Sequence, residues 1–254
     1  MRRVLVVGVG AGDPEYVTVA AMRALNEADV IFELDRATTD LTLAREALVA
    51  RFVEGGLGPR TVTVDEPRRD RAAERYAEAV QRWRAGRALA WERALIEELG
   101  ADGCGAFLVW GDPSLYDSTI AVLDEVLERG QVDFAYEVIP GISSIHALTA
   151  RHRIALNRVG GVVLITTGRR LAEQGWPEAV EDVVVMLDAG GAFRAVIDRP
   201  CDIYWGAYLG TEDELLISGP LAEVADEIER VRTQARERKG WVMDCYLLRS
   251  RATE

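Results

Sequence analysis

Residues 111–118 read GDPSLYDS and lie between two apolar segments. Residues 106–110 before them form a continuous apolar run, and residues 120–127 after them repeat their apolar side chains with the period of a helix. This order predicts a strand, a tight loop and a helix. Ligands of open α/β sheets bind at the carboxyl ends of the strands, where such loops lie. The loop therefore predicts either a ligand contact or an ordinary turn in which Asp112 caps the helix and Pro113 begins it.

The composition is that of a globular protein with an excess of acid. Of the 254 residues, 49% are hydrophobic and 28% are charged, and the formal net charge is −12. This charge disfavours nucleic acids and anionic membrane surfaces as partners, because their phosphates would be repelled. No apolar run approaches the ~20 residues of a membrane-spanning helix, so we expect a cytoplasmic protein. With two histidines, and three cysteines that share no ligand spacing, we expect reduced thiols and no metal site.

Short apolar segments alternate with helix-forming segments along the chain. The first half predicts a mostly parallel sheet, whereas the closer strands of the second half predict a mixed one. We therefore expect an α/β fold of two domains, residues 1–152 and 153–254, with a cofactor and substrate cleft between them. The longest helix-forming segment, residues 70–99, is expected to break near Gly86. The predicted strands cover residues 4–9, 30–32, 62–64, 106–110, 134–139, 162–165, 183–187, 203–208, 215–218 and 241–248.

The loop after the first predicted strand is similar to a dinucleotide-binding fingerprint but departs from it. Residues 8–12 read GVGAG, and the fingerprint requires a third glycine three positions after the second. That position holds Asp13, whose carboxylate would lie near an anionic pyrophosphate with no obvious cation to offset it. A nicotinamide or flavin cofactor is therefore disfavoured, and a glycine-rich entry to a site for another kind of ligand is favoured.

Three motifs follow one another in order along the chain. They are VGVGAGDP at residues 7–14 with Thr18, GDP at residues 111–113, and IPGISS at residues 139–144. Together with GAY at residues 206–208 and ISGPL at residues 217–221, this set resembles the tetrapyrrole methylases, which act in precorrin and sirohaem synthesis. The resemblance covers nearly the whole chain. It implies S-adenosylmethionine as the methyl donor, a tetrapyrrole as the small-molecule substrate, and a homodimer.

Two further segments narrow the resemblance within this family. Residues 148–154 and 202–211 are similar to the members that act on precorrin-5 in cobalamin synthesis. Those members remove an acetyl group and methylate ring carbon C1. Two alternatives stay open at this point: another precorrin C-methyltransferase that acts at a different ring carbon, and a non-catalytic module that binds a corrinoid.

The resemblance also implies which residues contact the cofactor. The first loop contains Ala11 where the family often has proline. This departure loosens the loop, so the resemblance defines its contact with the cofactor less closely than the other contacts. In the second domain, the family's cofactor-facing methionine corresponds to Met186, and a later glycine corresponds to Gly206. The full expected set is Gly10, Ala11, Trp110, Gly111, Asp112, Leu115, Ser143, Ser144, Met186 and Gly206.

Loss of an acetyl group requires a base for water and a donor for the carbonyl oxygen. The expected catalytic residues are Asp35 as the base and Arg36 and Tyr116 as donors; alternatively, the first two form a surface ion pair and Tyr116 is a core residue. A substrate with many carboxylates requires basic residues on an acidic protein. The expected substrate contacts are Arg153, Arg169 and Tyr208; alternatively, the arginines are solvated and the tyrosine belongs to the core.

Overall fold

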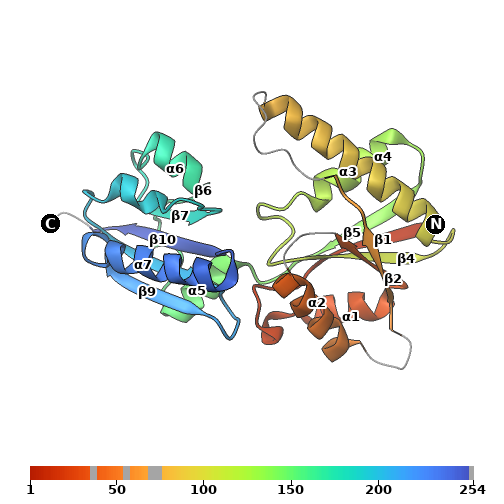
Figure 1. Cartoon of the computed structure of the whole chain (residues 1–254), viewed down its shortest axis with the longest axis horizontal. Coiled ribbons are helices and arrows are strands. Elements are labelled where there is room, and N and C mark those ends of the chain that lie inside the picture. The colour runs from red at the N-terminus through yellow and green to blue at the C-terminus, as the bar shows by residue number, and fades with distance from the viewer. Residues whose placement is uncertain (35–38, 54–57, 68–75, 252–254) are drawn as a thin grey trace. The chain divides into compact units, whose positions relative to one another are not determined.

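The computed structural model describes residues 1–34, 39–53, 58–67 and 76–251. The chain forms two compact units, Met1–Ile142 and Ser143–Glu254 (Figure 1). This division comes earlier than the expected one after residue 152, because helix α5 (Ser144–His152) packs on strands of the second unit. No helix in the described part of the chain has the length and apolar character needed to cross a membrane.

The first unit contains a five-stranded parallel sheet with the strand order β3-β2-β4-β1-β5. All strands run in the same direction, as the sequence predicted. Strand β4 is buried along its whole length and β1 from Val4 onward, which is typical of a sheet that is covered on both faces. The strands are β1 (Arg2–Gly8), β2 (Val30–Leu34), β3 (Arg60–Val64), β4 (Cys104–Val109) and β5 (Phe134–Ile139).

Helices cover both faces of this sheet (Figure 1). One face packs against α1 and α2 through Leu25 and Leu48. The other packs against α3 and α4 through Trp91 and Leu123, and the Trp91 ring stacks on Phe107 with 4.2 Å between centroids. The helices are α1 (Val19–Glu27), α2 (Thr39–Phe52), α3 (Tyr76–Glu98) and α4 (Thr119–Arg129), with a short 3-10 helix η1 (Pro14–Tyr16) before α1.

The chain reverses its winding between β1 and β4. These strands are neighbours in the sheet, but the chain leaves β1 toward the α1 face and leaves β4 toward the α4 face. Beyond these neighbouring strand ends, the chain therefore continues toward opposite faces of the sheet. In open α/β sheets this arrangement marks the point where ligands bind.

Helix α3 contradicts the expected break near Gly86. The helix is continuous from Tyr76 to Glu98. A Cβ atom at Gly86 would lie 2.8 Å from the Cγ atom of Pro67. The glycine therefore allows the segment after β3 to approach the helix closely, and it does not end the helix.

The second unit contains a mixed five-stranded sheet with the order β6-β7-β10-β8-β9. Strands β6 and β7 are parallel, and each of the other neighbouring pairs is antiparallel. The mixed sheet predicted from the closer strand spacing is thereby confirmed. The strands are β6 (Val163–Thr167), β7 (Asp182–Met186), β8 (Cys201–Ala207), β9 (Leu215–Pro220) and β10 (Asp244–Ser250).

Side chains of β8 and β10 alternate between the two faces of this sheet. Trp205 and Tyr246 belong to a core with α6 (Gly168–Gln174), the 3-10 helix η2 (Ala192–Val196) and α7 (Leu221–Lys239). Gly206 and Cys245 face the opposite side, where α5 packs: a Cβ atom at Gly206 would lie 2.8 Å from Leu148, and the Cys245 thiol lies 3.8 Å from the Ser144 carbonyl oxygen. The three cysteines are free and buried, as expected.

Three glycines bring the ends of β1, β4 and β5 into backbone contact. A Cβ atom at Gly141 would lie 2.1 Å from the carbonyl oxygen of Gly111 and 2.9 Å from the Cα atom of Gly8. A Cβ atom at Gly8 would lie 2.6 Å from the Gly141 nitrogen. All of these neighbours are backbone atoms, which cannot rotate away as a side chain can. The approach of the three loops therefore requires glycine.

Replacing Gly141 by alanine is expected to lower the free energy of unfolding by about 3 kcal/mol, because overpacked sites cost this much when the neighbours cannot move. Urea unfolding followed by tryptophan fluorescence measures the change. Gly100→Ala is the matched control in the same unit, since a Cβ atom there meets nothing within 4 Å. The control is expected to change stability by about 0.5 kcal/mol or less. Equal stability of the two variants would contradict the close approach.

Candidate functional site

The loops after β1 and β4 are joined by a pair of backbone hydrogen bonds. The amide of Gly111 donates to the carbonyl of Gly10 at 2.8 Å, and the amide of Gly10 donates to the carbonyl of Gly111 at 3.3 Å. Both residues have positive φ angles, +84° and +73°, which glycine adopts at little cost. Two residues expected at the cofactor, Gly10 and Gly111, are thus in direct contact.

The carboxylate of Asp112 links the loop after β4 to the loop after β5. One oxygen accepts from the Gly141 amide at 2.9 Å, and the other accepts from the Ser114 amide at 2.9 Å and from the Ser114 hydroxyl. Asp112 does not cap α4, because that helix begins at Thr119 and its N-cap is Ser118. The interpretation of this loop as an ordinary helix start is therefore wrong. The Asp112 carboxylate instead forms a hydrogen-bonded tie between the loop after β4 and the loop after β5.

Two neighbouring residues of the same loop contribute a hydrogen-bond donor and an exposed aromatic ring to this candidate site. The indole Nε1 atom of Trp110 is buried and has no hydrogen-bond partner among the described residues. Leu115 is half-buried and closes a turn by donating its amide to the Asp112 carbonyl at 3.2 Å. Tyr116 has a φ of +52° and a side chain that is 44% exposed. Such a conformation is uncommon for a bulky residue and often accompanies a functional loop.

In the loop after β1, the position of Asp13 disfavours the binding of a dinucleotide. Asp13 is the N-cap of η1, and its carboxylate accepts from the Glu15 amide at 2.9 Å. The carboxylate at the position of the fingerprint's third glycine is thus part of the local fold. Ala11 is buried beside it.

Helix α5 begins at Ser144 with Ser143 as its N-cap. The Ser143 side chain does not cap the helix, because its hydroxyl lies 2.8 Å from Nδ1 of His146. Sequence reasoning did not assign His146 to the site. The expected cofactor contacts of Ser143 and Ser144 stay predictions.

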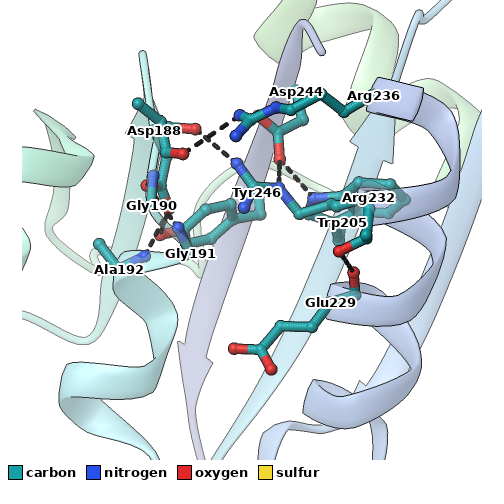
Figure 2. Close-up of polar contacts among 12 residues, drawn as sticks. Asp188, Gly190, Gly191, Ala192, Trp205, Glu229, Arg232, Arg236, Asp244 and Tyr246 are labelled. Atoms are coloured by element: carbon teal, nitrogen blue, oxygen red, sulfur yellow. Dashed lines mark hydrogen bonds and ion pairs between the residues drawn. The ribbon is translucent and has the colours of Figure 1, made fainter. Parts of the chain in front are cut away.

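In the second unit, Met186 ends β7 and the chain turns at Leu187. Leu187 has a φ of +53° and a side chain that is 64% exposed, so a large apolar group points into solvent directly after the half-buried Met186. The turn that follows is held by Asp188, whose buried carboxylate accepts backbone amides (Figure 2). Sequence reasoning missed Asp188; an aspartate followed by two glycines after a strand was the available signal.

Tyr208 lies in the core of the second unit. It is 2% exposed, and its hydroxyl donates to the carbonyl of Trp241. Burial raises the pKa of this hydroxyl, so it stays a neutral donor. Because its proton already has an acceptor in the protein, donation from this hydroxyl to a substrate would require the bond to Trp241 to break.

The arginines expected to contact substrate are exposed. Arg153 ends α5 with a φ of +56°, and Arg169 lies in the first turn of α6. Two nearby arginines in the sequence are already paired: Arg151 with Glu214, and Arg158 with the buried Asp182 at 3.9 Å. Asp35 and Arg36, the expected base and donor, lie outside the described residues.

Each unit, taken by itself, has one feature that fits a ligand. In the first unit, the buried Trp110 Nε1 atom lacks an acceptor in the described part of the chain, and buried donors are normally paired. In the second unit, Leu187 offers apolar surface in an unusual backbone conformation. S-adenosylmethionine has such acceptors in its adenosine and carboxylate and an apolar face in its adenine ring.

The model of the tetrapyrrole (corrin/porphyrin) methylase family matches residues 3–225. The chain belongs to this family. It is 51% identical over 254 residues to precorrin-6A synthase (deacetylating) from a Sinorhizobium species, covering 99% of this chain and 97% of that relative.

Solved structures agree with this assignment. A cobalamin synthesis related protein (CobF) from Corynebacterium diphtheriae has a TM-score of 0.83 and 38% identity, covering 98% of this chain and 99% of that chain. Uroporphyrin-III C-methyltransferase from Thermus thermophilus, solved with S-adenosylhomocysteine, has a TM-score of 0.55 and 21% identity, covering 97% and 96%; this likeness shows the fold alone. The predicted family and fold are confirmed, and the chain is an S-adenosylmethionine-dependent methyltransferase of cobalamin synthesis.

Replacing Asp112 by alanine is expected to weaken binding of S-adenosylhomocysteine about ten- to hundredfold, since a charged hydrogen-bond acceptor is worth roughly 1.5–3 kcal/mol. The loss removes the tie between Gly141 and the loop after β4. Isothermal calorimetry measures the dissociation constant.

Asp117→Ala is the control in the same loop. The Asp117 carboxylate accepts from the Thr119 amide at 2.7 Å and so supports the start of α4. This variant is expected to lose ~1 kcal/mol of stability with unchanged binding. Wild-type affinity in Asp112→Ala would show that the tie has no role in the site.

Proposed function

We propose that the chain methylates ring carbon C1 of precorrin-5 and removes the acetyl group of this substrate, forming precorrin-6A, acetate and S-adenosylhomocysteine. The observation that carries the proposal is the 51% identity to a precorrin-6A synthase (deacetylating), which extends over nearly the full length of both chains. The CobF structure supports it, with a TM-score of 0.83. A homodimeric state and a cytoplasmic location stay predictions.

S-adenosylmethionine supplies the methyl group as a sulfonium cation. The protein's contribution to such a transfer is mainly orientation, because a methyl group must lie in line between donor and acceptor atoms. In this proposal the loops at Gly10, Gly111 and Ser143 hold the cofactor from the first unit and the adjoining helix start. Met186 and Gly206 contact it from the second unit. No charged side chain has to transfer a proton during this step.

Removal of the acetyl group needs separate chemistry. The oxygen of water bonds to the acetyl carbonyl carbon, and the bond from that carbon to the ring breaks. The electron pair stays on the ring, and the acetyl group leaves as acetic acid. A base must take a proton from the water, and a donor must stabilise the charge that develops on the carbonyl oxygen. We assign Asp35 as the base and Arg36 and Tyr116 as the donors.

The product identifies the reaction. When precorrin-5 is incubated with S-adenosylmethionine carrying an isotopically labelled methyl group, mass spectrometry is expected to show one labelled methyl gained and one acetyl group lost. Free acetate is expected in equal amount, because each turnover releases one molecule.

The two alternatives give other outcomes in the same assay. A labelled methyl group without acetate would indicate a precorrin C-methyltransferase that acts at another ring carbon. Binding of the tetrapyrrole without either change would indicate a corrinoid-binding module. Either result would overturn the proposal.

Exposed arginines are proposed to bind the carboxylates of the substrate. Replacing Arg153 and Arg169 together by alanine is expected to weaken precorrin-5 binding about tenfold at low salt, where charge attraction is least screened. Affinity for S-adenosylhomocysteine is expected to stay unchanged. Fluorescence titration of the substrate and calorimetry of the cofactor product measure the two affinities.

The control for this variant removes two positive charges elsewhere in the same unit. Arg230 and Arg238 are exposed on α7. If their double replacement weakens substrate binding as much, the effect reflects net charge, and the assignment of Arg153 and Arg169 is wrong.

A further inference from the structure

A cluster of buried charges lies beneath the end of β7 (Figure 2). Asp188, Arg232 and Asp244 are all buried, and they come from the turn after β7, from α7 and from the first residue of β10. Nothing in the expected site included them. Charges are seldom buried unless they are paired and hydrogen-bonded, so the contacts of these three residues indicate what the cluster does.

Asp188 organises the turn that carries Leu187. One carboxylate oxygen accepts from the amides of Gly190 and Gly191, both at 2.9 Å. The other accepts from the Ala192 amide at 2.7 Å and from the Tyr246 hydroxyl at 2.8 Å. Four donors thus converge on one side chain. They leave the backbone at residues 188–192 little freedom, directly after a leucine in the left-handed conformation.

Arg232 connects this turn to the neighbouring strand. Its guanidinium donates to the Asp188 carbonyl at 2.6 Å and to the Asp244 carboxylate at 2.7 Å. The same Asp244 oxygen accepts from the Trp205 indole at 2.8 Å. Burial raises the pKa of the Asp244 carboxyl, while the adjacent Arg232 guanidinium opposes that shift.

The connected residues are next to the two positions of this unit, Met186 and Gly206, that the proposed function takes as cofactor contacts. Asp188 is two residues after Met186, and Trp205 directly precedes Gly206. Strands β7 and β8 do not pair with each other, because β10 lies between them. The backbone hydrogen bonds of the sheet connect β7 to β8 only through β10. The cluster adds a side-chain link between the ends of β7 and β8.

We propose that Asp188 and Arg232 are positioning residues of the methyl-donor site, which hold the Met186–Leu187 turn and the Trp205–Gly206 strand end at one spacing. The inference rests on the proposed function, because it takes Met186 and Gly206 as cofactor contacts. Asp188 and Arg232 act through these neighbours. Such residues matter because a small misplacement of a binding group is costly in an oriented reaction.

The simpler explanation is that Asp188 only stabilises the fold. The chain contains a second buried aspartate, Asp182, that serves as a matched control for this explanation. Asp182 begins β7, is fully buried, and pairs with Arg249 at 3.1 Å. It thus resembles Asp188 in burial and in having an arginine nearby, but it lies at the opposite end of the same strand. Loss of either carboxylate is expected to destabilise the unit. Only loss of Asp188 is expected to change the turn after β7.

The test compares Asp188→Asn with Asp182→Asn in the full-length protein. Binding of S-adenosylhomocysteine is measured by calorimetry well below the melting temperature of each variant. Asp188→Asn is expected to raise the dissociation constant about tenfold or more, whereas Asp182→Asn is expected to melt earlier and bind like the wild type. Equal effects of the two variants on binding, or wild-type binding by Asp188→Asn, would overturn the proposal.

Tyr246→Phe provides a second variant that retains the buried ring. It removes a single donor from Asp188 and is expected to give a smaller rise in the dissociation constant. Hydrogen exchange at Gly190, Gly191 and Ala192 is expected to become faster, because the carboxylate that accepts these amides is held less firmly. Unchanged exchange and unchanged affinity would also overturn the proposal.

The same series separates this inference from the proposed function. If wild-type protein does not bind S-adenosylhomocysteine, the cofactor assignment itself fails. If wild type binds the cofactor product and converts precorrin-5 as proposed, but Asp188→Asn does both equally well, only the positioning role fails. A higher KM for S-adenosylmethionine in Asp188→Asn would add support, since a loss of folded protein lowers the apparent kcat and leaves KM unchanged.

Discussion

The absence of a side chain at Gly141 is the constraint on which the ligand edge of the first unit depends. Its Cα must lie against the Gly111 carbonyl and the Gly8 backbone, so three strand ends meet with nothing between them. That contact sets the positions of the loops after β1, β4 and β5 together. The Asp112 carboxylate then bonds the Gly141 amide across this junction. The close backbone packing sets how near the three strand ends lie. The hydrogen bond from the Gly141 amide to the Asp112 carboxylate then fixes the orientation of the two loops that it joins.

The second unit holds its corresponding strand ends by different means. There the turn after β7 and the end of β8 are separated by β10, so their backbones cannot pack as the three glycines do. The buried Arg232 bridges the distance instead, because it donates to the Asp188 backbone carbonyl and to the Asp244 carboxylate. Buried ion pairs contribute little net stability, because desolvation offsets their attraction, but they can enforce one arrangement over others. The cluster therefore serves to fix the geometry of these strand ends more than to add stability.

Local patterns predicted the strands well, because buried parallel and mixed sheets require apolar runs that are visible in the sequence. They were less informative where a residue's partner is distant. Gly86 was expected to break a helix, but its partner is Pro67, in another segment. Asp112 was open to interpretation as a cap, but its carboxylate bonds an amide 29 residues away. Arg232 gave no signal, since its contact with Asp188 spans 44 residues. The ordered motifs identified the family, and the cofactor loops that the resemblance implies stay a prediction.

The strand order of the second sheet has a consequence for how the chain acquires its structure. Strand β10 lies at the centre, between β7 and β8, yet it is the last strand to be synthesised. Until residues 244–250 leave the ribosome, β7 and β8 each lack the partner that they share. The first unit has its five strands by residue 139. Domains generally fold as units during synthesis, so the first unit can fold on the nascent chain, while the second must wait for its last strand and then form long-range pairs.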